Sequence, residues 1–227
     1  MKPALLNIAV WPPVEYMAVV LFHGEIILER HEHFQKQSYR NRYIISGPNG
    51  LQPLTVPVDK KGMRHILIDQ CGITYHENWQ QLHWRSIATA YNNSPYYLFF
   101  KDELSYLYHQ PIPSLWDFAI KTIATASKLL RQEAGFSVTK EYKPIRDDVI
   151  DLRARMHPKK GIKGSNASLV AQTNPYPQVF SDRYGFIENL SILDLIFNEG
   201  PAGLQWLKKL YEKIIVTSPF FHQDIQP

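Results

Sequence analysis

The chain has 227 residues, of which 44% are hydrophobic and 13% aromatic, so it can bury a substantial core in one large domain or two small ones. Its 25 basic and 21 acidic residues give a net charge of +4. This excess is too small, and too evenly distributed, to indicate nucleic-acid binding. The single cysteine, Cys71, excludes an intramolecular disulfide and favours a reducing compartment.

The N-terminal segment is the one place where a targeting signal is suggested. Its apolar residues are interrupted by Trp11, Pro12, Pro13 and Glu15, and the pieces on either side are too short to cross a bilayer. We therefore expect no membrane insertion and a cytoplasmic location.

The first thirty residues have the pattern strand, helix, strand. Residues 4–10 form an unbroken apolar run that ends at the WPP motif, because proline cannot continue a hydrogen-bonded ladder. A helix is expected from about Val14 to Phe22, and Gly24 separates it from a second buried strand over residues 25–29. This order is typical of a βαβ unit with parallel strands.

The remaining elements follow in chain order. Residues 43–58 predict a hairpin with a Gly-Pro-Asn-Gly turn, and residues 65–69 a short strand. Three helices are expected over residues 78–135, with Ser114 as the N-cap of the third. After a strand-like segment come a mobile loop over residues 143–169, a short strand within 176–186, and helices over 189–214 broken near Gly200-Pro201.

These elements predict an α/β fold, with a three-layer or Rossmann-like open sheet that begins with the βαβ unit. We expect a single domain over residues 1–227. Its α/β core would comprise residues 1–75 and 136–185, its helical part residues 78–135, and its C-terminal helices residues 188–215.

A dense polar string, RHEHFQKQSYRNR, follows the second strand at residues 30–42. Ligands of open α/β sheets bind beyond the carboxyl ends of the strands, so a site is expected here. If the chain stays extended, His31, His33 and Gln35 share one face. Arginine forks bind phosphate or carboxylate in a bidentate manner. The cations of the string are Lys36, Arg40 and Arg42. The alternative is a solvated basic loop.

The sequence identifies no cofactor. His31 and His33 could bind a metal together, but spacing fixes no third ligand, and His76, His83 and His157 are only distant partners. We therefore predict no metal site. The WPPVEYM turn occupies the phosphate-binding position of Rossmann-like folds, yet it lacks the glycines of a dinucleotide fingerprint.

Four further residues each allow a functional and a structural interpretation. His83 lies four residues after Trp79, so it is either a core histidine or a general base. Cys71 is a nucleophile only if a neighbour lowers its pKa, and a buried structural cysteine is the more common outcome. Arg153 and His157 either close over an anionic ligand or belong to a solvated basic loop.

Several motifs in the same order resemble the WbqC-like family, bacterial proteins often associated with gene clusters for O-antigen and other surface polysaccharides. They are HFQKQSYRNRYIISGPNG, LTVPV and GFIENLSILDLIFNEG, and the resemblance runs from WPPVEY to FNEG. The family pattern falls on Pro12 to Tyr16 and on Lys36, Ser38, Tyr39, Asn41 and Arg42. Many relatives carry carboxylates just before the lysine. This chain has Arg30, His31, Glu32 and His33 there, so only Glu29 and Glu32 could supply an acidic role.

The resemblance implies an enzyme of lipopolysaccharide or related surface-polysaccharide biosynthesis, with acyl or aminoacyl transfer to an activated amino sugar as the expected reaction. Its partner would be a phosphate-bearing small molecule, either a nucleotide sugar or a carrier-bound acyl donor. The alternatives are a nucleotide-binding ligase or nucleotidyltransferase, and a non-catalytic assembly protein. The expected catalytic residues are His33, His83 and Glu32; the expected substrate-binding residues are Lys36, Ser38, Arg40, Asn41, Arg42 and Tyr16, with Arg153 and His157 from the loop.

Overall fold

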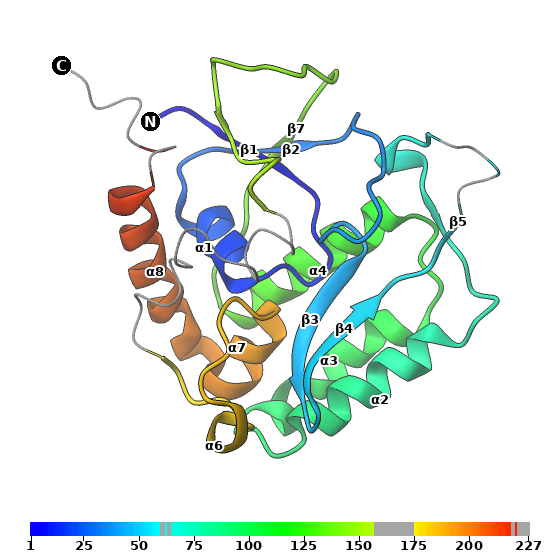
Figure 1. The fold of residues 1–227 in the computed structure, drawn as a ribbon, viewed down its shortest axis with the longest axis vertical. Helices are drawn as coiled ribbons and strands as arrows, with labels where there is room; N and C mark the ends of the chain where they lie inside the picture. Colours follow the sequence, from blue (N-terminus) through cyan, green and yellow to red (C-terminus); the bar gives the residue numbers. More distant parts are fainter. Residues whose placement is uncertain (60–61, 63–64, 157–174, 219–220, 222–227) are drawn as a thin grey trace.

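A computed structural model describes residues 1–59, 62, 65–156, 175–218 and 221. Its largest sheet has four strands in the order β7-β2-β1-β8, and all neighbouring strands are parallel. The strands are β1 (Ala4–Asn7), β2 (Ile26–Glu29), β7 (Ser137–Val138) and β8 (Ile150–Asp151). The predicted α/β class is therefore confirmed. Figure 1 shows this sheet at the top of the view, with the helices beneath it.

The βαβ unit forms as the sequence predicts. Every residue of β1 is buried, and helix α1 (Val14–Phe22) connects β1 to β2. Seven of the nine α1 residues are buried because the helix packs against both α7 (Ile192–Glu199) and α8 (Gly203–Thr217) as well as the sheet side of the core. Apart from Glu15, the α1 sequence has no charged residue, as expected for a helix enclosed on several sides.

The predicted hairpin is also present. Strand β3 (Arg42–Gly47) pairs antiparallel with β4 (Gly50–Thr55), and Gly50 at the turn has a φ of +92°. A smaller ladder joins β5 (Val58–Asp59) to β6 (Gly72–Ile73). The strand expected over residues 65–69 is wrong: Ile68–Gln70 form a 3-10 helix, and Leu67 makes only an isolated bridge with His33. The chain turns there because the amide of Gln70 bonds to the carbonyl of Leu67.

The three central helices are confirmed as α2 (Trp79–Tyr91), α3 (Tyr97–His109) and α4 (Leu115–Leu129). Ser114 caps α4 by accepting a hydrogen bond from the amide of Asp117. The break near Gly200-Pro201 is the 3-10 helix Gly200–Ala202 between α7 and α8. The strand expected within residues 176–186 is wrong, since Ser181–Tyr184 form the short helix α6. Residues 157–169 of the expected loop lie outside the described residues, and its earlier part contains β8.

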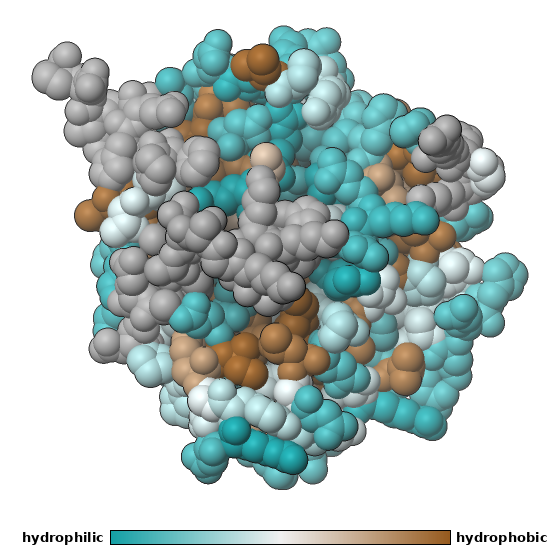
Figure 2. Space-filling model, viewed as in Figure 1, coloured by the Kyte–Doolittle hydropathy of each residue, from teal (hydrophilic) through white to brown (hydrophobic). Residues whose placement is uncertain are grey.

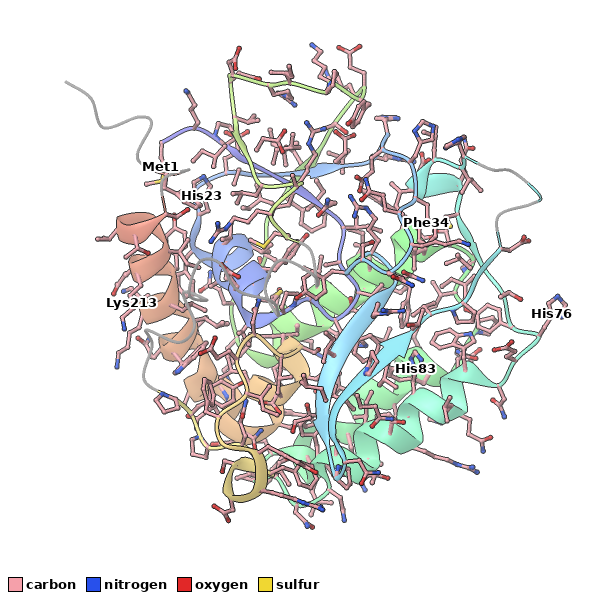
Figure 3. All side chains as sticks on the ribbon, viewed as in Figure 1. Met1, His23, Phe34, His76, His83 and Lys213 are labelled. Carbon is pink, nitrogen blue, oxygen red and sulfur yellow. The ribbon has the colours of Figure 1, made fainter. Side chains whose placement is uncertain are left out.

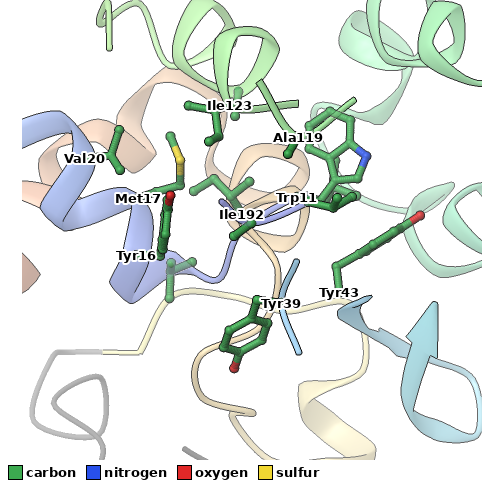
Figure 4. Packing of buried hydrophobic residues seen from close by; sticks show 14 of the residues in the cluster. Trp11, Tyr16, Met17, Val20, Tyr39, Tyr43, Ala119, Ile123 and Ile192 are labelled. Atoms are coloured by element: carbon green, nitrogen blue, oxygen red, sulfur yellow. The ribbon is translucent and has the colours of Figure 1, made fainter. Parts of the chain in front are cut away.

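Trp11 ties the βαβ unit to the helical part of the chain. Its indole Nε1 donates to the Tyr108 hydroxyl at 2.7 Å, and its backbone amide donates to Thr122 Oγ1 at 3.1 Å. Its carbonyl accepts from Ser191 Oγ at 2.9 Å. The residue is fully buried, as the close view in Figure 4 shows, and it adopts a φ of +41°. These bonds offset the cost of that backbone conformation, about 1–2 kcal/mol.

Within the described ranges, no helix is both long enough and apolar enough to span a membrane.

Gly200 provides a direct test of the packing between α7 and α3. It has a φ of +56°, and a Cβ added there would lie 2.5 Å from the ring of Tyr96. Gly200→Ala should lower the free energy of unfolding by about 1–3 kcal/mol, because both the backbone and the ring are strained. Chemical denaturation measures this loss. Gly24→Ala is the matched control: a Cβ there meets no atom within 4 Å, so stability should change by less than about 1 kcal/mol.

Candidate functional site

Polar side chains gather at the carboxyl ends of the parallel strands. Asn7 ends β1, Glu29 ends β2, Asp151 ends β8, and Thr139 directly follows β7. Because the strands are parallel, these residues meet at one edge of the sheet. Glu29 is fully buried, and its Oε1 accepts hydrogen bonds from Thr139 Oγ1 at 2.7 Å and from the backbone amide of His31 at 2.9 Å.

Arg153 connects residues of different strands at this edge through hydrogen bonds. Its Nη1 donates to Glu29 Oε2 at 3.0 Å, its Nε donates to Asp151 Oδ1 at 3.0 Å, and its Nη2 donates to the carbonyl of Lys143 at 2.9 Å. The guanidinium also lies 5.0 Å from the ring centre of Tyr142. An anionic ligand would therefore have to displace a carboxylate from Arg153. The other expected loop residue, His157, lies outside the described residues.

Glu32 and Arg40 form a buried ion pair at the beginning of the polar string. Arg40 Nε donates to Glu32 Oε1 at 2.7 Å and its Nη2 donates to the other carboxylate oxygen. Burial raises the pKa of Glu32, and the hydrogen bonds from Arg40 oppose that rise. The charges of Glu32 and Arg40 both influence the pKa of Tyr16. The Tyr16 hydroxyl donates a hydrogen bond to the carbonyl of Asn7 at 2.9 Å. The structure thus brings together Glu32, Arg40 and Tyr16, but with Arg40 occupied by Glu32.

The extended conformation does not continue through the string, which consists of bends and turns from His31 to Asn41. The face that His31, His33 and Gln35 would share is therefore not formed. Ser38 Oγ donates to the Gln35 carbonyl at 2.7 Å and stabilises a turn.

The last residues of the string form hydrogen bonds with the second half of the hairpin region. Asn41 Nδ2 donates to the carbonyl of Val56 at 3.0 Å, and Arg42 Nε donates to Thr55 Oγ1 at 3.0 Å. Lys36 is exposed.

His83 is a core histidine with both ring nitrogens engaged. It is 2% exposed, its Nδ1 lies 3.0 Å from the Tyr43 hydroxyl, and it also bonds to the backbone carbonyl of Thr55. The carbonyl of Thr55 can only accept, so the ring proton of His83 lies on Nε2. Nδ1 then accepts from Tyr43, and Tyr43 accepts from Tyr108, which itself accepts from the indole of Trp11. Burial lowers the pKa of His83 to about 4.

His33, the other candidate base, lies in a different neighbourhood. It is exposed and bridges Leu67, and its ring centre is 5.7 Å from that of His65. The described contacts of His33 and His83 share no residue. Figure 3 shows His76 at the outer edge of the molecule, away from His83. In the part of the chain that the structure describes, no group of three or more His, Cys, Asp or Glu side chains is arranged to hold a metal ion.

A cleft of about 310 Å³ lies between the β3–β4 hairpin and the segment that leads into α7. Figure 2 shows apolar surface in the lower centre of the view, over the region of β3 and α7. The lining residues are Tyr39, Ile44, Leu51, Phe186, Ile187, Glu188, Asn189 and Leu190.

Glu15 borders the polar end of this cleft. Its backbone amide donates to Asn189 Oδ1 at 3.2 Å, and its Oε2 accepts from Asn189 Nδ2 at 3.3 Å. Arg155 Nη2 lies 3.8 Å from Glu15 Oε1. Burial raises the pKa of Glu15, while the charge of Arg155 and the amide of Asn189 partly oppose the rise. Burial raises the pKa of Tyr39, which lines the cleft, and the negative charge of Glu15 raises it further.

The sequence interpretation did not include Glu15 or Asn189 among the site residues. Glu15 has a recognisable signal, since it is an acid in the first turn of a helix that follows the first strand of a βαβ unit. Asn189 lies more than 170 residues away in the chain, and its φ of +52° suits an asparagine. The amides of Val14 and Glu15 bond to Leu190 and Asn189, so they are not available to a phosphate.

The architecture defines an α/β protein whose open parallel sheet carries its polar groups at the carboxyl edge, in the manner of Rossmann-like folds. The model of the WbqC-like protein family matches residues 9–173, most of the chain, and the protein belongs to this family. The chain is also 31% identical to the uncharacterized protein Rv1507c of Mycobacterium tuberculosis over 93 residues. The match spans 41% of this chain and 40% of that protein. No solved structure matches.

The buried state of His83 predicts a pH-dependent stability. The unfolded residue binds a proton below about pH 6.5, whereas the folded residue stays neutral to about pH 4. Stability from this residue is therefore lost as the pH falls between these values, by up to about 3 kcal/mol. His83→Gln cannot titrate, but it can still accept from Tyr43 and donate to Thr55.

Urea unfolding at a series of pH values compares the two proteins. Relative to the wild type, His83→Gln should gain stability steadily from pH 7 to pH 4. A constant difference across this range would contradict a neutral core histidine.

Proposed function

We propose that the protein is an enzyme of bacterial surface-polysaccharide biosynthesis, which transfers an acyl or aminoacyl group to the amine of an activated sugar. One observation carries the proposal: a partly desolvated carboxylate, Glu15, borders the polar end of a cleft that has both apolar and polar walls. Membership of the WbqC-like family supports the substrate class. A cleft with one raised-pKa group is a typical arrangement for a small-molecule site.

Glu15 supplies the base that amide formation requires. The acceptor amine attacks the carbonyl carbon of an acyl thioester, and its proton passes to Glu15. The carbon–sulfur bond then breaks, and the thiol leaves after taking up a proton. The hydroxyl of Tyr39, whose raised pKa keeps it protonated, can donate a hydrogen bond to the oxyanion of the tetrahedral intermediate.

Glu15 suits this role better than the bases expected from the sequence. His83 has both ring nitrogens engaged, Glu32 is held by Arg40, and His33 is exposed. For the phosphate of the substrate we propose Arg42 and Lys36. Arg42 lies two residues before Ile44 on the same face of β3, and Ile44 lines the cleft.

A second candidate function is a non-catalytic assembly protein, and one surface favours it. Helix α3 exposes Leu98, Phe99 and Tyr106, whose exposed fractions are 67%, 75% and 58%. Such a row of large apolar side chains is typical of a protein-binding face. Co-purification of other proteins that is lost in Phe99→Asp and retained in Glu15→Gln would favour this function. The nucleotide-binding ligase has less support, because the first amides of α1 are already engaged.

Replacing Glu15 tests the enzyme directly. The purified protein is incubated with panels of acyl thioesters and nucleotide-linked amino sugars, and mass spectrometry detects the amide product. Glu15→Gln should lower kcat by about 100-fold or more, because it removes the base while keeping the shape of the side chain. The wild-type rate should rise with pH through the raised pKa of Glu15.

Glu25→Gln is the matched control, since Glu25 is an exposed carboxylate between α1 and β2 and its replacement should leave the rate unchanged. Equal rates for Glu15→Gln and the wild type would eliminate Glu15 as the base. Thermal stabilisation by the nucleotide alone, without amide product, would support the ligase instead.

A further inference from the structure

A buried carboxylate on α7 lies behind the wall of the cleft, outside the residues already assigned to the site. Asp194 is 1% exposed, and burial raises its pKa to about 6. Its Oδ2 accepts hydrogen bonds from the Tyr176 hydroxyl at 2.8 Å and from Gln178 Nε2 at 2.9 Å. A carboxylate is costly to bury without a cation, so its hydrogen bonds to these two side chains need an explanation.

Gln178 connects Asp194 to the cleft wall. Its Oε1 accepts from the backbone amide of Ile187 at 2.8 Å, and its Nε2 donates to the carbonyl of the same residue at 2.9 Å. The side-chain amide thus clamps Ile187 from both sides while its remaining hydrogen is held by Asp194. Tyr176 adds a second contact, since its ring packs edge-on against Phe186 with centres 5.2 Å apart.

The clamped segment is the one that holds Glu15. Residues 185–190 between α6 and α7 have no helix or strand ladder of their own, so side chains must fix their backbone. Figure 1 shows this segment running from α6 up to α7. Two residues after Ile187, Asn189 bonds to both the backbone amide and the carboxylate of Glu15.

We propose that Asp194 and Gln178 are positioning residues for Glu15. Asp194 orients the amide of Gln178, that amide fixes Ile187, and the fixed wall presents Asn189 to Glu15. Neither residue lines the cleft, so each acts only through the wall. The role of these residues in catalysis rests on the proposed function. Their effect on the local stability of Ile187 and Glu15, which we call the coupling, can be measured without any substrate.

The test is amide hydrogen exchange of the full-length protein, followed by NMR. Asp194→Ala removes the acceptor and should speed the exchange of the Ile187 and Glu15 amides at least 10-fold. Asp194→Asn keeps an oxygen acceptor for Tyr176 and Gln178, so it should stay within about 2-fold of the wild type. This rescue by the conservative variant separates positioning from general loss of packing.

Tyr75→Phe controls for global destabilisation, since it removes the two hydrogen bonds between the Tyr75 hydroxyl and the backbone of Ile112, and neither residue lines the cleft. The Glu15 amide should exchange faster in Asp194→Ala than in this control at matched overall stability. If Asp194→Ala does not fold, Gln178→Leu breaks the same clamp and should give the same local effect.

The coupling is overturned if the Glu15 amide exchanges at the wild-type rate in Asp194→Ala or Gln178→Leu, or only as fast as in Tyr75→Phe. The acyl-transfer assay described above tests the role in catalysis independently of hydrogen exchange. With both proposals correct, Asp194→Ala lowers kcat and alters its pH profile with little change in KM, and Asp194→Asn restores both. Faster local exchange together with full transfer activity in Glu15→Gln would keep the coupling and reject the proposed function.

Discussion

The structure depends on the buried turn at Trp11. This residue hydrogen-bonds to α3 through its indole, to α4 through its amide and to the N-cap of α7 through its carbonyl. It thereby fixes the βαβ unit against three helices that are distant in sequence. Its left-handed φ directs the chain from β1 into α1, and so decides where the first turn of α1, with Glu15, lies. Two of these bonds use backbone groups, and the indole adds the third against a conformational cost of about 1–2 kcal/mol.

The carboxyl edge of the sheet shows how a polar cluster can be structural. Arg153 bonds to both Glu29 and Asp151, and Arg40 pairs with Glu32, so these charges at the expected ligand position already have partners within the protein. Breaking such a buried pair by removing one partner costs about 3–5 kcal/mol. The cleft lies away from these pairs, between the hairpin and the segment that leads into α7, and the pKa of Glu15 at its polar end is raised by burial.

Hydrogen bonds link Glu15 to Asn189 and Ile187 through Gln178 to Asp194, and the backbone from Ile187 to Asn189 joins the two sets. The carboxylates of Glu15 and Asp194 both have raised pKa values, and in both cases burial is the largest cause. The two pKa values are thus raised by the same cause, but the two side chains have different surroundings. Glu15 borders a cleft that a substrate can enter, whereas Asp194 is enclosed by side chains that it orients. A raised pKa alone would not distinguish the base from its support, and the geometry does.

The sequence by itself determined the α/β class, the βαβ unit, the hairpin, the central helices and the family, because periodicity and turn residues are local properties. It also placed the polar string at the edge where ligands are expected. Only the tertiary structure decided that Arg40 pairs with Glu32, that His83 is a core residue, and that Ile68–Gln70 form a 3-10 helix instead of a strand. Whether a charge is free or paired depends on neighbours far away in the chain. For Glu15 that neighbour, Asn189, is supplied by a segment at the other end of the molecule's sequence, and folding alone brings them together.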